Sequence, residues 1–145
     1  MNVRIPDPRK LPIKRPGEEP PKRLKRVRGT PEDDLQAGIV AMFEARKAPD
    51  TLGFSVPNGG YRSWKAARTM KRTGQMPGIT DLVFINLFGL AFFMEVKAKR
   101  GSLRPEQKGV RDWCLARNIP WVVVRSVADA EAWLLKNKLI APLAA

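Results

Sequence analysis

Residues 81–97 have the sequence DLVFINLFGLAFFMEVK, and this stretch decides the fold. It contains two apolar runs with the composition of β-strands, joined by a short loop in which Asn86 and Gly89 are turn formers. Asp81 precedes the first run, and Glu95 lies at the end of the second. The stretch therefore predicts a β-hairpin that carries one carboxylate on each strand.

The expected register of this hairpin brings its charged side chains together. A loop that folds symmetrically about Phe88 sets Asp81 directly opposite Glu95, and opposed residues have Cβ atoms about 4.5–5.5 Å apart. Side chains alternate between the two faces of a strand, so Glu95 and Lys97 project from the same face. The sequence thus predicts two carboxylates and one ammonium group at a single place.

This trio of side chains favours metal-dependent chemistry on phosphate. Two close carboxylates repel each other unless a cation lies between them, and Mg²⁺ is often held by one or two carboxylates with water and substrate phosphate. The alternative is that the acids are exposed strand residues, or that Glu95 and Lys97 form a simple ion pair. Both acids border apolar strands, where an unpaired buried charge is costly, and this favours the metal site.

Other motifs occur around the hairpin at fitting spacing. They are Glu32-x-x-x-Gln36, Pro57-Asn58-Gly59-Gly60, Gly78-Ile79-Thr80-Asp81, Met94-Glu95-Val96-Lys97 and Leu103-Arg104-Pro105-Glu106-Gln107. On these motifs, the chain from Glu32 to Trp133 resembles a VRR-NUC domain, a branch of the PD-(D/E)xK nuclease superfamily. The chain departs from the common Gly-x-Pro-Asp pattern of that family, because Thr80 stands where the proline would be.

The resemblance implies an α/β fold with a restriction-endonuclease-like core, in which helices flank a mixed central β-sheet. It implies Mg²⁺ or Mn²⁺ as the cofactor, hydrolysis of DNA phosphodiester bonds in branched or flapped DNA, and a role in DNA repair or recombination. The residues it assigns to catalysis are Asp81, Glu95, Lys97, Glu32 and Gln107, and its metal ligands are Asp81, Glu95, the Val96 carbonyl group and Glu32. Free-standing domains of this kind also resemble junction resolvases in pairing as homodimers.

Glu32 has an explanation that needs no chemistry. Thr30 and Pro31 predict a helix start, and acids are favoured in the first turn of any helix. From spacing alone, Glu32 is more often a helix-start acid than a ligand. Gln107 likewise lies in the first turn of a helix expected from Pro105, where a polar side chain commonly faces solvent.

Composition bounds the function. The chain has 145 residues, a formal net charge of +13 and a pI of about 10.6, as expected of a nucleic-acid-binding protein. Histidine is absent, which excludes histidine-based nucleases and Ser-His-Asp hydrolases, and the single Cys114 excludes an internal disulfide. We find no signal peptide and no membrane-spanning run, so a cytoplasmic protein is expected, and a phage or bacterial source fits. Neither a membrane nor a small-molecule cofactor is expected as a partner.

Two zones of different composition divide the chain. Residues 1–29 hold ten Lys or Arg, three Asp or Glu and six prolines, which predicts an extended, flexible basic tail. Residues 30–145 are expected to form the nuclease-like domain, with elements in the order helix, strand, helix, strand, strand, helix, strand, helix. Residues 120–124 are predicted to be a strand buried on both faces.

Basic residues near the hairpin are the candidate DNA contacts. A helix is expected over residues 62–72, a segment without any acid, and a basic loop follows Lys97. The predicted contacts are Arg62, Lys65, Arg68, Lys71, Arg72, Lys99 and Arg100, although a cationic face can also be merely solvated. Two alternatives to the nuclease stay open: a non-catalytic nucleic-acid-binding protein with a nuclease-like fold, and a sequence-specific restriction enzyme.

Overall fold

A computed structural model describes residues 29–57 and 64–144 of the chain. Residues 1–28 of the predicted basic tail over residues 1–29 lie outside the described residues, as do Arg62 and residues 58–60 of the Pro57–Gly60 motif. Side chains are described from Arg68 onward in the second helix, so the side chain of Lys65 is outside this set as well.

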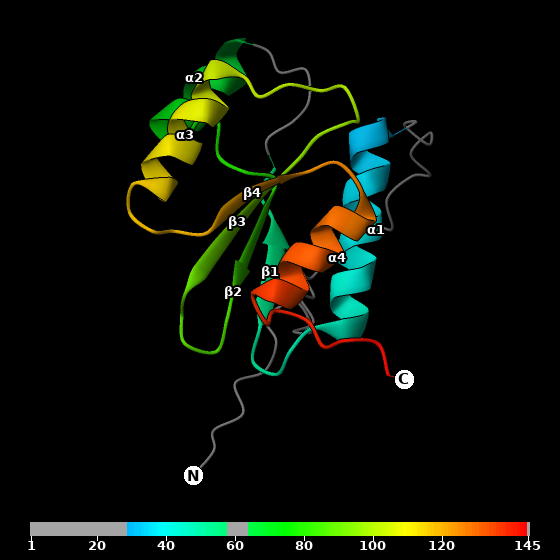
Figure 1. Ribbon diagram of the computed structural model, residues 1–145. Helices are drawn as coiled ribbons and strands as arrows, with labels where there is room; N and C mark the ends of the chain where they lie inside the picture. Colours follow the sequence, from blue (N-terminus) through cyan, green and yellow to red (C-terminus); the bar gives the residue numbers. More distant parts are fainter. Residues whose placement is uncertain (1–28, 58–63, 145) are drawn as a thin grey trace, which may run out of the picture.

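Within the described residues, eight helices and strands follow in the predicted order. They are α1 (Pro31–Arg46), β1 (Leu52–Ser55), α2 (Trp64–Arg72), β2 (Leu82–Ile85), β3 (Ala91–Val96), α3 (Pro105–Leu115), β4 (Trp121–Val124) and α4 (Val127–Lys136). The strands form one sheet in the order β1-β2-β3-β4, antiparallel except for the parallel pair β3 and β4. Figure 1 shows α1 and α4 side by side against the sheet, with α2 and α3 together at its other end. The predicted mixed α/β architecture is confirmed.

The helix boundaries follow from local chemistry. The Thr30 hydroxyl oxygen accepts a hydrogen bond from the Asp33 amide, and the Asp33 carboxylate accepts one from the Thr30 amide, which closes a capping box. Pro31 stands at the first helical position, where its missing amide hydrogen costs nothing. At the start of α4, the Ser126 hydroxyl oxygen accepts from the Asp129 amide in the same way.

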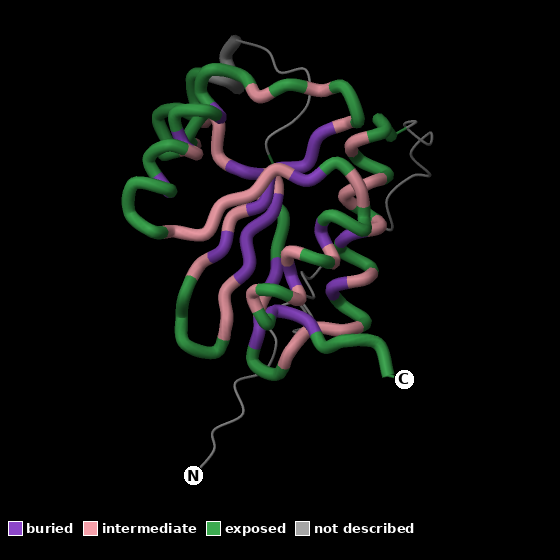
Figure 2. The backbone as a smooth tube through the Cα atoms, in the orientation of Figure 1, coloured by how far each residue is buried: buried purple, intermediate pink, exposed green. Residues whose placement is uncertain are grey.

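The core lies between one face of the sheet and the pair α1 and α4. The even-numbered residues of β3 point to this face, and the Phe84 ring of β2 packs 4.8 Å from the Phe43 ring of α1, measured between centroids. Figure 2 shows the buried positions concentrated along the strands and the inner faces of these two helices. The cluster comprises Ile39, Phe43, Leu82, Phe84, Phe92, Met94, Val96, Val124, Ala130, Leu134, Leu139 and Ile140. The odd-numbered residues of β3, Glu95 among them, therefore face the other way.

The prediction for residues 120–124 is wrong in part. Trp121–Val124 form a strand, β4, and Pro120 lies before it, but only Val124 is buried, and Trp121, Val122 and Val123 are partly exposed. The reason is position: β4 is the last strand of the sheet and pairs only with β3 among the described strands. The first strand begins at Leu52, and a Cβ atom at Gly53 would lie 2.6 Å from the Phe43 ring and 2.8 Å from the Phe84 ring.

Candidate active site

The β2–β3 hairpin has the predicted register. Phe84 pairs with Phe92 and Leu82 with Met94, so the pairing is symmetric about Phe88, and one further step sets Asp81 opposite Glu95. The Asp81 carboxylate lies against β3, where its Oδ2 atom accepts a hydrogen bond of 2.9 Å from the Val96 amide. The acid before the first strand is therefore fixed on the second strand by a backbone donor.

Glu95 is fully buried, and three groups surround its carboxylate. The Lys97 ammonium lies 2.9 Å from Glu95 Oε1, and the Gln107 amide nitrogen donates to the same oxygen. Asp81 lies near enough to interact with Glu95 through its charge and its side chain. The other oxygen, Glu95 Oε2, is buried without a hydrogen-bond partner among the described residues. A buried carboxylate oxygen without a donor is costly and marks a place for a cation or a proton.

Burial also changes the acidity of the pair. It raises the pKa of Glu95 to about 7, against the hydrogen bond from Lys97, and the Asp81 charge adds to this rise. Burial likewise raises the pKa of Asp81, while the Val96 amide and the Lys97 charge lower it. Both carboxyl groups therefore hold protons more tightly than ordinary acids, as expected where a positive charge is needed to keep both ionised.

The two carboxylates fit a hard divalent cation. Asp81 and Glu95 offer oxygen ligands on one face of the hairpin, and Mg²⁺ commonly takes one or two carboxylates while water and phosphate fill the remaining positions. No group of three or more Asp, Glu, Cys or His residues is arranged for a metal among residues 29–57 and 64–144. The site thus supplies two carboxylates, and not the three of a closed protein cage.

Glu32 lies beside the pair and binds the backbone. Its Oε1 atom accepts a hydrogen bond of 3.0 Å from the Ala98 amide, one residue beyond Lys97. Its charge still acts on Asp81 by raising the pKa of that carboxyl group. In this arrangement Glu32 holds the loop that follows β3, and its predicted role as a metal ligand stays a prediction.

Gln107 links the acid pair to α3. Its Oε1 atom accepts from the Arg104 amide at 2.9 Å, while its amide nitrogen donates to Glu95. These two partners fix the orientation of the amide, since the opposite orientation would turn an acceptor toward the carboxylate. The residue is buried, and its expected solvent-facing alternative does not hold.

Sequence reasoning did not single out Arg125 as a functional residue. Its guanidinium donates to the carbonyl oxygens of Ala98 and Gly101 at 2.8 and 2.6 Å, so it holds the same loop after Lys97 that Glu32 binds. The feature that could have indicated Arg125 is the parallel pairing of β3 and β4. Val96 pairs with Val124, so the residues that follow them, Lys97 and Arg125, are adjacent.

Five of the predicted DNA contacts are among the residues with described side chains. Arg68, Lys71 and Arg72 are exposed on α2, and Lys99 and Arg100 are exposed on the loop after Lys97. None of the contacts described above brings one of these five side chains to the carboxylates. They stay predicted DNA contacts around the acid pair.

Two solved structures share this fold. One, titled "VRR_NUC domain", is 23% identical over 74% of this chain and 97% of its own, with a TM-score of 0.53. The other, titled "VRR_NUC domain protein", is 18% identical over 78% of this chain and 91% of its own, with a TM-score of 0.54. The sequence matches no family model and no curated protein. At these identities the likeness shows the fold, and it supports the predicted VRR-NUC resemblance at that level.

Proposed function

We propose that this protein is a nuclease that hydrolyses DNA phosphodiester bonds with Mg²⁺ or Mn²⁺ and selects DNA by its structure. The observation that carries the proposal is the buried Glu95 beside the half-buried Asp81, with the Lys97 ammonium 2.9 Å from Glu95 and one Glu95 oxygen without a donor among the described residues. A divalent cation held there would acidify a bound water and polarise the phosphoryl oxygens.

The side chains then have separate roles. Asp81 and Glu95 bind the cation, with the Val96 carbonyl group as a further predicted ligand. Lys97 orients the attacking water or stabilises the charge that develops on phosphate, since its ammonium lies at the carboxylates and is itself almost fully buried. Gln107 positions Glu95 and does not touch the reacting atoms. Glu32 supports the loop that carries the residues after Lys97.

The charge of the chain supports a polyanionic substrate. A net charge of +13 attracts the phosphate backbone without selecting a sequence, and basic residues on α2 and after β3 border the site. Among the described residues no helix is long and apolar enough to cross a membrane. The homodimer stays a prediction, which light scattering on the purified chain tests directly.

The experiment uses the full chain with supercoiled plasmid and with labelled flapped, branched and linear duplexes. Cleavage is expected with Mg²⁺ or Mn²⁺ and none with a chelator. Asp81→Asn, Glu95→Gln and Lys97→Ala should each lower the rate by about 10²–10³ or more, the size seen when one preorganised group is removed. Lys136→Ala, an exposed change on α4, is the matched control for Lys97→Ala and should keep full activity.

Two results would contradict the proposal. Cleavage that survives the three site variants, or that needs no metal, would remove the acid pair from the chemistry. DNA binding that weakens steeply with salt, without cleavage in any metal, would select the non-catalytic nucleic-acid-binding protein. Circular dichroism of each variant separates a lost site from a lost fold.

A further inference from the structure

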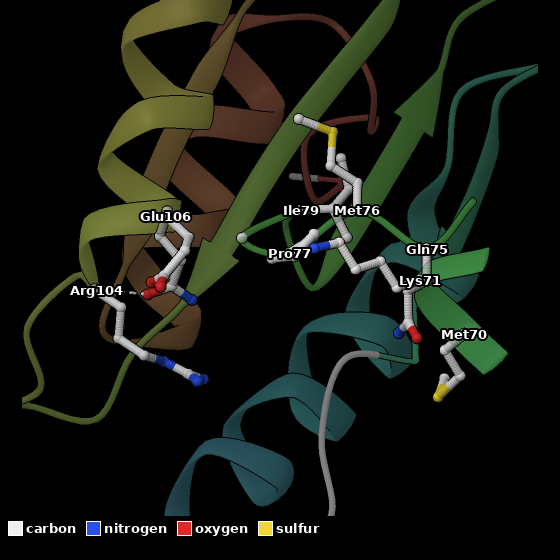
Figure 3. Close-up of a pocket in the computed structure, with 10 residues that line it drawn as sticks. Met70, Lys71, Gln75, Met76, Pro77, Ile79, Arg104 and Glu106 are labelled. Atoms are coloured by element: carbon white, nitrogen blue, oxygen red, sulfur yellow. Dashed lines mark hydrogen bonds between the residues drawn. The ribbon is translucent and has the colours of Figure 1, made fainter. Parts of the chain in front are cut away.

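Gln107 also lines a cavity of about 390 Å³. Its walls are the end of α2, the loop that leads to Asp81, and the first turn of α3. Figure 3 shows Arg104 and Glu106 on one wall and Lys71 and Gln75 on the other, with Pro77 and Ile79 between them. The volume is in the range of small-molecule sites.

The loop that leads to Asp81 and the first turn of α3 meet in a close backbone contact. Gly78 has a φ of +79°, and a Cβ atom there would lie 2.4 Å from the carbonyl carbon of Glu106. Only glycine combines this backbone conformation with this approach. The loop is thereby pressed onto the start of α3, so the cavity between them is built into the fold.

The polar groups of the cavity suit one phosphate and one base edge. Lys71 and Arg104 supply a cation from each wall, and a guanidinium is well shaped for phosphate oxygens. Glu106 supplies the opposite chemistry, a carboxylate that can accept a hydrogen bond from an exocyclic amine of a base. A simple anion site would not gain from that acid.

The remaining wall is apolar. Met70, Met76 and Ile79 line it, and Met76 keeps 54% of its surface exposed although it is a large apolar residue. Methionine adapts its shape and packs well against flat rings, and stacking on a base face requires no particular sequence. The wall therefore offers a surface for a base beside the cations for its phosphate.

One side chain lies between the cavity and the acid pair. Gln107 lines the cavity and donates to Glu95. A DNA strand with a phosphate at the acid pair can therefore pass its neighbouring nucleotide into the cavity. A base that enters it has left its partner in the duplex, which is easiest near flaps, branches and strand ends.

We propose that this cavity is a subsite for one unpaired nucleotide next to the cleaved phosphate, with the phosphate between Lys71 and Arg104 and the base against Met70 and Met76. The inference rests on the proposed nuclease function and gives its preference for branched or flapped DNA a physical origin. Arg104 becomes a specificity residue that the sequence did not indicate.

The test measures nucleotide binding by NMR, without divalent metal, on the full chain labelled at its methionine methyl groups. 2′-Deoxycytidine 5′-monophosphate, whose base carries an exocyclic amine for Glu106, is added in the millimolar range. It should shift the Met70 and Met76 signals and leave those of Met42, on α1, and Met94, in the core, in place. Inorganic phosphate and 2′-deoxycytidine, tested separately, should each bind more weakly than the nucleotide, because each makes only part of the contacts.

Matched variants separate a site from general charge attraction. Lys71→Ala and Arg104→Ala should each weaken nucleotide binding about tenfold, as expected for the loss of one charged hydrogen bond. Lys108→Ala removes an exposed cation of α3 that does not line the cavity, and it should change the affinity less than about twofold.

The outcomes distinguish the two proposals. Absent shifts of Met70 and Met76, equal shifts of all methionines, or equal losses in Arg104→Ala and Lys108→Ala would overturn the subsite. Nucleotide binding with the expected shifts, in a chain that cleaves no DNA, would keep the subsite and refute the nuclease. Cleavage without the shifts would refute the subsite alone.

Discussion

The two ends of the β2–β3 hairpin reverse the usual distribution of polar and apolar residues. At one end, Glu95 and Lys97 are buried although they are charged. At the other end, Leu87 and Phe88 are 59% and 77% exposed although they are apolar, and Figure 2 shows this loop as exposed. Between the two ends, Leu82, Phe84 and Met94 form part of an ordinary core.

The contrast shows which end of the hairpin lowers the free energy of unfolding. Charges buried at the acid end oppose folding, and their close packing with Gln107 and the Val96 amide indicates that the arrangement is retained for its chemistry. Apolar side chains exposed at the tip forgo burial without leaving any polar group unpaired. The acid end should therefore control pH dependence and activity, and the tip should control neither.

The largest effect on stability is expected from pH at the acid end. The pKa of Glu95 rises from 4.5 in the unfolded chain to about 7 in the metal-free protein, so the folded state holds more protons between these values. The contribution of Glu95 to the free energy of unfolding is therefore complete below about pH 4.5. It decreases as pH rises toward 7, by up to about 3 kcal/mol. Urea unfolding in chelator at several pH values measures it.

Glu95→Gln should remove most of this slope, because the amide does not titrate. Asp112→Asn, which changes a carboxylate exposed on the surface of α3, is the matched control and should leave the slope intact. Mg²⁺ should raise stability most above pH 7, where both carboxylates are ionised and available. If the free energy of unfolding does not change between about pH 4.5 and 7, burial does not raise the pKa of Glu95.

A smaller effect on the free energy of unfolding is expected at Asn86, where the hairpin loop begins. The Asn86 side-chain oxygen accepts hydrogen bonds of 3.0 Å from the amides of Phe88 and Leu90, which holds the loop in its turn. Asn86→Ala leaves both donors to water and should lower the free energy of unfolding by about 1 kcal/mol, as measured by urea unfolding.

Asn86→Asp keeps the accepting oxygen and is the matched control. It should lose less stability than Asn86→Ala, while both variants keep the pH slope of the unchanged protein. If the two substitutions cost the same, the side-chain oxygen does not hold the turn, and the loop conformation depends on Gly89 with its φ of +77°.

Much of the hairpin could be predicted from the sequence because its determinants are local. The alternation of side chains, the turn formers and the odd loop length fix the register about Phe88, and this places Asp81 opposite Glu95. The start of α1 followed from Thr30 and Pro31 for the same reason. The residues that determine the hairpin and the start of α1 lie within a few positions of one another in the sequence.

The remaining features depend on how distant elements dock. Nothing local to Gln107 indicates that it donates to Glu95, because this requires the first turn of α3 to lie on the odd-numbered face of β3. The same holds for Glu32 and the Ala98 amide, 66 positions apart, and for the cavity between α2 and α3. The apolar run of β4 predicted burial, but its place at the edge of the sheet decided otherwise.

The smallest effect is expected at the tip. Phe88→Ser removes an aromatic ring that is 77% exposed, so little burial is lost and the free energy of unfolding should change by less than about 0.5 kcal/mol. Phe84→Ala is the matched control from the same hairpin: that ring is 1% exposed and packs on Phe43, and its loss should cost about 3–5 kcal/mol. A cost above about 1 kcal/mol for Phe88→Ser would mean that the tip is covered in solution, and the contrast between the two ends would then be one of buried charge alone.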